Sequence, residues 1–108
     1  ADQRIIGFAS AEMIGQNLHL WQIAISPAHQ RQGIGAAMID ALQILAKHHA
    51  AQAITLTTFR DVPWNQPWYQ RLGFATLTAA DAPPHLHRIL SDEAQAGLTN
   101  RCGMSRPV

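Results

Sequence analysis

Residues 25–35 decide the fold, and they read Ile25-Ser26-Pro27-Ala28-His29-Gln30-Arg31-Gln32-Gly33-Ile34-Gly35. An apolar stretch precedes this segment, and a stretch with helical periodicity follows it. Pro27 cannot donate to a β ladder, so it favours the end of a strand at this point. Gly33 and Gly35 allow dihedrals and close backbone approaches that other residues adopt only at a cost. We therefore expect a strand, a glycine loop and a helix in that order.

The strand before the loop is predicted to belong to a hairpin. Arg4 to Ile14 and Leu18 to Ser26 are rich in strand-forming residues, and the turn-like Gly15-Gln16-Asn17 lies between them. Successive side chains of a strand point to opposite sides, so the second strand divides into two sets. The pattern predicts one face with Trp21, Ile23 and Ile25, and another with Leu20, Gln22 and Ala24.

The stretch after the loop favours a helix from Gly35 to His49. Its apolar residues Met38, Leu42 and Leu45 recur at helical spacing. The next stretch, Ala53 to Phe59, is typical of a buried strand. A strand, a helix and a second strand in succession predict a right-handed parallel crossover.

The second half of the chain alternates shorter elements. Asn65 is predicted to cap a short helix over Gln66 to Leu72, which Gly73 ends. Phe74 to Thr78 favours a strand, and the two prolines of Ala79 to Pro84 indicate a loop.

The last elements are another helix and a strand. Leu86, Ile89, Leu90 and Ala94 form a helical stripe that Gly97 can end, and Arg101 to Ser105 favours a final strand. The chain shows no internal repeat and no linker, so residues 1–108 are predicted to form a single domain.

Composition narrows the possible partners. The formal net charge is +1 and the charged residues are scattered, so we expect no nucleic-acid partner. No apolar run approaches the ~20 residues that span a bilayer, so we expect no membrane segment. The single Cys102 cannot form an internal disulfide and no signal peptide is evident, so we expect a reducing cytoplasm. One cysteine does not complete a zinc set with His48-His49 or His85-x-His87; we expect exposed histidines there and no metal.

A strand-to-helix junction is a candidate anion site. The first helical N–H groups have no intrahelical partner and point at whatever lies in front of them, which suits a phosphate. Arg31 can add a charge-assisted hydrogen bond. The residues alone leave open that Gly33 and Gly35 only ease a tight turn. The sequence does not match the dinucleotide-binding fingerprint, because Met38 stands where that motif has its third glycine. No Walker sequence occurs either.

Two blocks carry a family resemblance. The first is Ile25-x-Pro27-x-x-Gln30-Arg31-Gln32-Gly33-Ile34-Gly35-Ala36, and the second is Asn65-x-Pro67-Trp68-Tyr69-Gln70-Arg71-Leu72-Gly73-Phe74. Together they resemble the acetyl-CoA signature and the later Tyr-to-Gly-Phe block of the GNAT acetyltransferases, over roughly Ile5 to Met104. The resemblance implies an α/β (α+β) fold: a mixed, largely antiparallel sheet flanked by helices, an acyl-CoA N-acyltransferase-like three-layer sandwich that lacks the usual N-terminal strand and helices.

The resemblance also implies a set of acetyl-CoA-binding residues. The pantetheine arm would lie along the strand as an extra strand would, and the pyrophosphate would rest on the amides of Arg31 to Ala36. The set comprises Ile23, Ala24, Ile25, Gln30, Arg31, Gln32, Gly33, Ile34, Gly35, Ala36 and Asn65. Asn65 is treated chiefly as a helix cap, because the family's spacing to the tyrosine would place the matching residue at Val62.

The family's reaction is direct attack of an amine on the acetyl thioester, without a covalent enzyme intermediate. Tyr69 matches the position of the acid that protonates the CoA thiolate, although its ring could also serve packing. A backbone amide at Ile23 to Ile25 could stabilise the oxyanion. Relatives often carry a glutamate on the second hairpin strand, where this chain has none. Glu12, His19 and Asp61 are candidate bases, and each also fits a plain surface group. Trp64 and Trp68 fit either a substrate pocket or core anchors.

Two functions stay open. One is an N-acetyltransferase acting on a small-molecule or peptide amine, and the other is a CoA-binding or regulatory module with weak or no activity. The strand from Arg4 to Ile14 would present an unpaired edge, so we expect a larger parent polypeptide or a homodimer.

Overall fold

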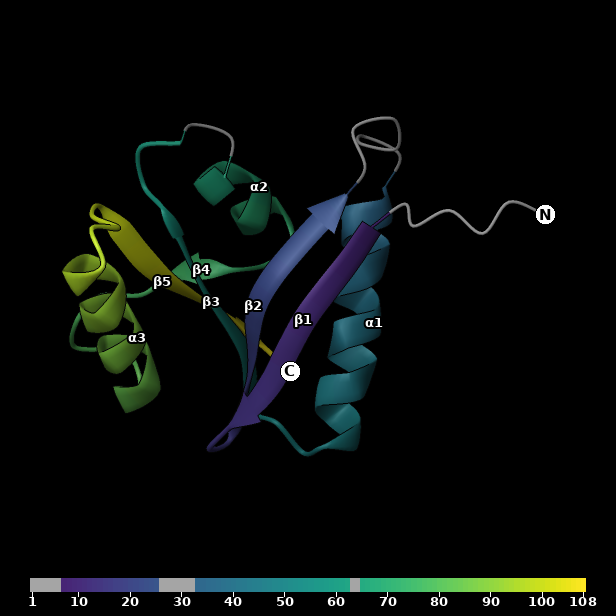
Figure 1. Cartoon of the computed structure of the whole chain (residues 1–108). Coiled ribbons are helices and arrows are strands. Elements are labelled where there is room, and N and C mark those ends of the chain that lie inside the picture. The colour runs from purple at the N-terminus through teal and green to yellow at the C-terminus, as the bar shows by residue number, and fades with distance from the viewer. Residues whose placement is uncertain (1–6, 26–32, 63–64) are drawn as a thin grey trace.

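The computed structural model describes residues 7–25, 33–62 and 65–108. In these residues five strands form one sheet in the order β1-β2-β3-β5-β4. The elements in chain order are β1 (Gly7–Ile14), β2 (Asn17–Ile25), α1 (Ile34–His48), β3 (Ala53–Phe59), α2 (Asn65–Arg71), β4 (Ala75–Thr76), α3 (Pro84–Gln95) and β5 (Arg101–Pro107). Helices α1 and α3 lie on opposite sides of the sheet (Figure 1). This mixed three-layer arrangement confirms the predicted fold class.

The predicted hairpin is confirmed over its described residues. Strands β1 and β2 pair antiparallel around a turn in which Gly15 has a φ of 57°. Arg4 and Ser26, the predicted outer ends, lie outside the described residues. The register changes by one: Ser10 faces Gln22, whereas Ala11 faces Leu20. Trp21 is therefore the extra residue of a β-bulge in β2.

The bulge corrects the predicted division of β2 into faces. Ile23 packs against the same buried cluster as Leu18 and Leu20, on the side of α1. The Trp21 ring instead contacts the His19 ring on the side of α3, with centroids 4.4 Å apart. The prediction that Trp21 and Ile23 share a face was wrong, because the inserted residue changes the alternation along the strand.

The parallel crossover is confirmed. Helix α1 begins and ends one residue earlier than predicted, β3 has the predicted bounds, and β2 runs parallel to β3. The parallel ladder covers only residues 17–19 of β2 and 53–55 of β3, and its last pair is His19 with Thr55. Beyond this pair the two strands diverge (Figure 1).

The main core lies between the sheet and helices α1 and α2. Its buried residues are Leu18, Leu20, Ile39, Leu42, Ala46, Ala51, Ile54, Leu56, Phe74, Cys102 and Met104. On the opposite side, Leu86 of α3 is fully buried, and its side chain would lie 3.0 Å from a Cβ placed on Gly103. Both faces of the central strands are therefore covered.

The later elements differ from the predictions mainly at their ends. Helix α2 begins at Asn65 itself, and Gly73 follows it with a φ of 93°. Strand β4 is shorter than predicted, because Thr78 and Asp81 form a turn directly after it. Helix α3 begins at Pro84, where proline is tolerated since the first helical N–H has no partner.

Candidate functional site

The candidate site surrounds the point where β2 and β3 diverge. The bulge at Trp21 bends β2 just after the last pair of the parallel ladder. Among the described residues, none of those after His19 in β2 pairs with β3. Main-chain groups beyond the end of a ladder can hydrogen-bond an extended ligand as a further strand would.

The N-terminus of α1 lies at the end of the loop that follows β2. Gly33 is its N-cap, with a φ of 75° in the left-handed region that favours glycine and with no side-chain capping bond. The first recorded helical bond runs from Ala37 N–H to the Gly33 carbonyl, at 3.0 Å. The amides of residues 34–36 precede that bond, and the first turn carries no acidic side chain. Such a terminus attracts an anion. Gln30, Arg31 and Gln32 lie outside the described residues.

Gly35 has a role in packing that the sequence did not indicate. A Cβ placed on it would lie 2.5 Å from Cζ2 of Trp68 and 3.1 Å from Cδ1 of Ile25. The absence of a side chain thus lets α2 pack against the start of α1. Trp68 is half-buried there, which favours its interpretation as an anchor. Trp64 lies outside the described residues.

Tyr69 lies next to this contact. Its ring packs against the main core, with centroids 4.9 Å from Trp68 and 5.7 Å from Phe74. Burial raises the pKa of the Tyr69 hydroxyl, and the positive charge of Arg101 opposes this rise. The phenol is therefore protonated at neutral pH. Among the described residues its hydroxyl has no hydrogen-bond partner, so none of them holds the proton.

The three candidate bases have different environments. Glu12 is exposed and accepts a hydrogen bond from Nε1 of Trp21 at 2.6 Å. Asp61 is exposed just after β3. His19 is only 1% exposed, so its interpretation as a surface group was wrong. Burial first, and then the nearby His85, lowers the pKa of His19 to about 4.

His19 belongs to a polar group on the α3 side that the sequence did not reveal. Its Nδ1 is 2.8 Å from Oγ1 of Thr55, and the same oxygen is 2.9 Å from Nε2 of His85. His85 is 8% exposed, which corrects the expectation of an exposed histidine. Burial, followed by the charge of Arg88, lowers the pKa of His85. The alternating threonines of β3 were the only signal, because the three residues lie 30 or more positions apart.

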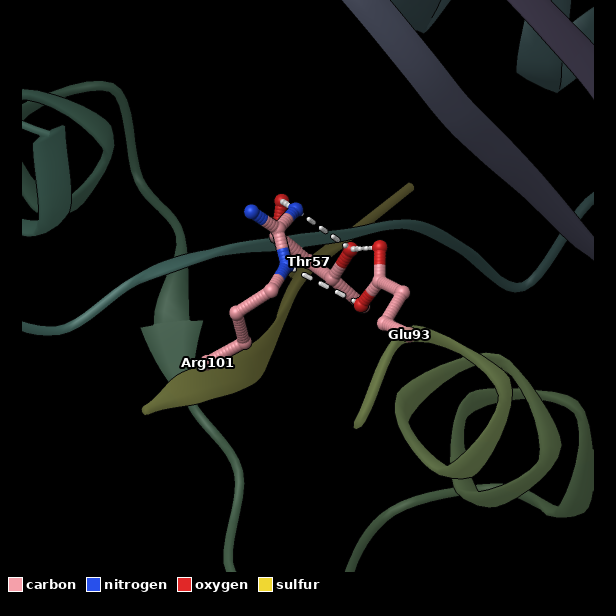
Figure 2. Close-up of polar contacts among 3 residues, drawn as sticks. All are labelled: Thr57, Glu93 and Arg101. Atoms are coloured by element: carbon pink, nitrogen blue, oxygen red, sulfur yellow. Dashed lines mark hydrogen bonds and ion pairs between the residues drawn. The ribbon is translucent and has the colours of Figure 1, made fainter. Parts of the chain in front are cut away.

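A second polar group joins α3 to the sheet (Figure 2). Arg101 donates from Nε to Oε1 of Glu93 at 3.0 Å, and from Nη2 to the carbonyl and Oγ1 of Thr57 at 3.2 and 3.1 Å. The Thr57 hydroxyl donates to Oε2 of Glu93 at 3.0 Å. The Arg101 guanidinium lies 4.3 Å from the centre of the Phe59 ring. Arg101 was predicted only as a strand residue, since its partners are distant in sequence.

Neither a metal site nor a membrane span is found in the described part of the chain. No group of three or more His, Cys, Asp or Glu residues there could hold a metal ion. None of the helices within the described ranges has the length and apolar character needed to cross a bilayer.

Comparison with known proteins gives consistent matches. A profile described as "Acetyltransferase (GNAT) family" matches residues 1–74. The PaiA N-acetyltransferase from Thermoplasma acidophilum, solved with coenzyme A, aligns with a TM-score of 0.75 and 17% identity over 100% of this chain and 57% of that one. N-acetylglutamate synthase from Neisseria gonorrhoeae, complexed with coenzyme A and N-acetyl-glutamate, aligns with a TM-score of 0.79 and 16% identity. This alignment covers 99% of this chain and 24% of that one. The ribosomal-protein-S18-alanine N-acetyltransferase from Escherichia coli aligns with a TM-score of 0.71 and 18% identity, over 100% of this chain and 64% of that one. The chain spans less than two thirds of each of these proteins, and the likeness at these identities concerns the fold.

Proposed function

The chain belongs to the acetyltransferase (GNAT) family, and from this premise we propose that it binds acetyl-CoA and transfers the acetyl group to an amine in a ternary complex. The observation that carries the proposal is the glycine-capped start of α1 beside the divergence of β2 and β3. It combines a site for the pyrophosphate with a strand edge for the pantetheine arm.

The cofactor would lie as follows. The pyrophosphate rests on the amides of Arg31 to Ala36, with Gln30 and Gln32 in the same loop. The pantetheine arm would run along Ile23, Ala24 and Ile25 of β2, and Asn65 at the start of α2 completes the proposed set. Two of the similar structures, PaiA and the N-acetylglutamate synthase, contain coenzyme A in this fold, which supports a CoA-type cosubstrate for this chain.

The reaction then needs few protein groups. The acceptor nitrogen attacks the thioester carbonyl, a C–N bond forms and the C–S bond breaks. The amine loses a proton to a base, and the departing CoA thiolate receives one from Tyr69. A main-chain amide of β2 stabilises the oxyanion. The Tyr69 phenol holds its proton at neutral pH, as an acid must, although burial makes that proton harder to release.

Replacement of Tyr69 by phenylalanine tests that role. The variant keeps the ring and its contacts with Trp68 and Phe74 but has no proton to give. We expect kcat to fall by about 10²-fold while acetyl-CoA affinity stays within twofold. Thiol release during turnover, together with calorimetry of acetyl-CoA, measures both quantities. A kcat equal to that of the wild type would remove Tyr69 from the mechanism.

A catalytically weak or inactive CoA-binding module is the second candidate. The observation that favours it is the absence of a carboxylate from β2, which reads NLHLWQIAI. Calorimetry with acetyl-CoA and CoA, followed by thiol release with spermidine, L-glutamate, kanamycin and a peptide with a free N-terminus, separates the candidates. Binding without turnover supports the module. Absence of binding by both cofactors contradicts both candidates.

We also propose that this single domain works in the cytoplasm and forms a homodimer through β1. This strand is at one edge of the described sheet; Phe8 on β1 and Trp21 on β2 are each 47% exposed. An edge strand with exposed apolar neighbours favours pairing with another chain. Light scattering after size exclusion measures the mass, and a monomer at every concentration up to 0.1 mM or so contradicts the dimer.

A further inference from the structure

Three buried polar side chains form a continuous hydrogen-bonded chain on the α3 side of the sheet. It joins His19 of β2, Thr55 of β3 and His85 of α3, through contacts of 2.8 and 2.9 Å. The exposed fractions are 1%, 1% and 8%, so only His85 approaches the surface. The two imidazole rings are edge to face with centroids 5.5 Å apart, and Trp21 covers His19 from the other side.

The number of protons on His19, Thr55 and His85 fixes which group donates and which accepts in each of their hydrogen bonds. The Thr55 hydroxyl has one proton, so it donates to one imidazole nitrogen and accepts a hydrogen bond from the other ring. Burial lowers the pKa of both histidines, so both rings are neutral at pH 7. Each ring then has one N–H and one lone pair. The three groups form a directed path, and proton shifts along that path reverse its direction.

The charged groups around the three hydrogen-bonded side chains leave the two imidazole rings neutral. Arg88 on α3 disfavours a proton on His85. Glu12 on β1 is engaged by the Trp21 indole, and Glu93 on α3 pairs with Arg101 of β5. Within the ranges that the structure describes, no hydrogen bond joins a carboxylate to either ring. A positive charge is therefore disfavoured on both rings.

The three hydrogen-bonded side chains begin next to the candidate site. His19 and Thr55 form the last pair of the parallel ladder, directly before β2 and β3 diverge. Nε2 of His19 has no hydrogen bond among the described residues. The start of α1 and Tyr69 lie on the α1 side, so the cofactor would approach from there. An amine that attacks the thioester must then come from the α3 side, where His19 lies.

Resting on the proposed function, we propose that His19, Thr55 and His85 carry away the proton of the attacking amine, in place of the carboxylate that β2 lacks. As the C–N bond forms, the half-exposed Trp21 ring that covers His19 must turn aside, and the nitrogen gives its proton to Nε2 of His19. Nδ1 of His19 gives its proton to the Thr55 oxygen, and the Thr55 hydroxyl proton moves to Nε2 of His85. His85 then loses its Nδ1 proton to solvent. Each group gives one proton and receives one, so no net charge stays buried.

A matched pair of variants at Thr55 tests the path. Thr55→Val keeps the shape but removes the hydroxyl, whereas Thr55→Ser keeps the hydroxyl. With the fastest acceptor of the four-amine panel, we expect kcat of Thr55→Val to fall by about 10²-fold with KM and acetyl-CoA affinity unchanged, and Thr55→Ser to stay within about threefold. Equal kcat values for the two variants would overturn the relay, provided that circular dichroism shows both folded.

His85 offers a readout that a packing role would not move. His85→Ala leaves space at the surface end of the chain, so added imidazole can replace the missing base. We expect the restored rate to rise with the pKa across a series of substituted imidazoles of similar size. Restoration that follows size and not basicity would assign His85 to packing and overturn its place in the relay.

Nuclear magnetic resonance of the unliganded full chain tests the relay without turnover. Imidazole ¹⁵N shifts at pH 7 should show one protonated nitrogen in each of the two rings, and Thr55→Val should shift both. A charged ring at pH 7, or shifts unaffected by Thr55→Val, would overturn the relay. Failure of acetyl-CoA to bind the wild-type chain would instead contradict the proposed function, and the shifts would still decide on the hydrogen-bonded path.

Discussion

The two faces of β3 are held in place by different kinds of interaction. On the α1 side, Ile54 and Leu56 belong to a buried cluster that is almost entirely apolar. On the α3 side, Thr55 and Thr57 each join two other side chains by hydrogen bonds. Apolar burial supplies more free energy per residue, whereas hydrogen bonds fix geometry and protonation. The α1 side therefore contributes most of the packing free energy, and the α3 side fixes the geometry and protonation of its ionisable groups.

The largest effect is expected from a cavity on the α1 side. Leu56 is 2% exposed, and Leu56→Ala should lower the free energy of unfolding by about 2–5 kcal/mol. Urea unfolding followed by circular dichroism measures the change. A loss below about 1 kcal/mol would mean that this face is less tightly packed than the burial indicates.

Acid should weaken the α3 side through its histidines. The pKa of His19 is about 4 in the folded chain and 6.5 in the unfolded one. The contribution of His19 to the free energy of unfolding is complete above pH 6.5. It declines as the pH falls from 6.5 towards 4, because the unfolded chain takes up the proton first. At 1.36 kcal/mol per unit, the loss is roughly 3 kcal/mol.

Urea unfolding at about pH 7, 5.5 and 4 measures this loss. His19→Gln should flatten the dependence on pH, whereas the exposed His48 provides the matched control. If His48→Gln flattens it as much as His19→Gln, the buried ring is not its source.

Gly35→Asp should abolish cofactor binding while the α3 side stays intact. The new side chain would meet the Trp68 ring and place a carboxylate beside the phosphates. We expect a loss of at least roughly 100-fold in acetyl-CoA affinity by calorimetry. Ala41→Asp adds the same charge at an exposed position of α1 and should bind normally. Binding by Gly35→Asp within twofold of the wild type would move the phosphates elsewhere.

The smallest effect is expected at Thr57. Thr57→Val removes the hydroxyl that links Glu93 and Arg101, but those two residues still pair with each other at 3.0 Å. The expected loss is about 1 kcal/mol, with a fall in Tm of roughly 4–8 °C for a chain of this size. A scanning calorimeter measures it. A loss as large as that of Leu56→Ala would erase the distinction between the two faces.

Much of the fold was predictable because it depends on local pattern. Helix α1 and strand β3 were placed within one residue, since alanines, helical periodicity and β-branched residues act over short distances. The bulge at Trp21 was not, because it arises from pairing with β1 and breaks the assumed alternation. The same holds for the α3-side contacts, whose partners lie 30 to 44 positions apart in three of the hydrogen bonds around Thr55 and Thr57.

The candidate site divides in the same way. The glycine-capped helix start followed from residues that are adjacent in the chain. The contact of Gly35 with Trp68 depends on how two helices meet, and the burial of His19 and His85 depends on α3, so neither could be read from composition or spacing. The roles of Tyr69 and of the cofactor-binding residues stay predictions until the binding and turnover measurements are made.

The extra residue in β2 has a consequence for the length of that strand. The extra residue shifts the alternation of side chains by one position. Leu20 before the bulge and Ile23 after it therefore both reach the same apolar layer. Removing one residue there would restore a regular pleat and turn the distal isoleucines out of that layer, while straightening the bend that separates the strands. A single inserted amino acid thus keeps the apolar layer continuous across the bend at which β2 and β3 separate.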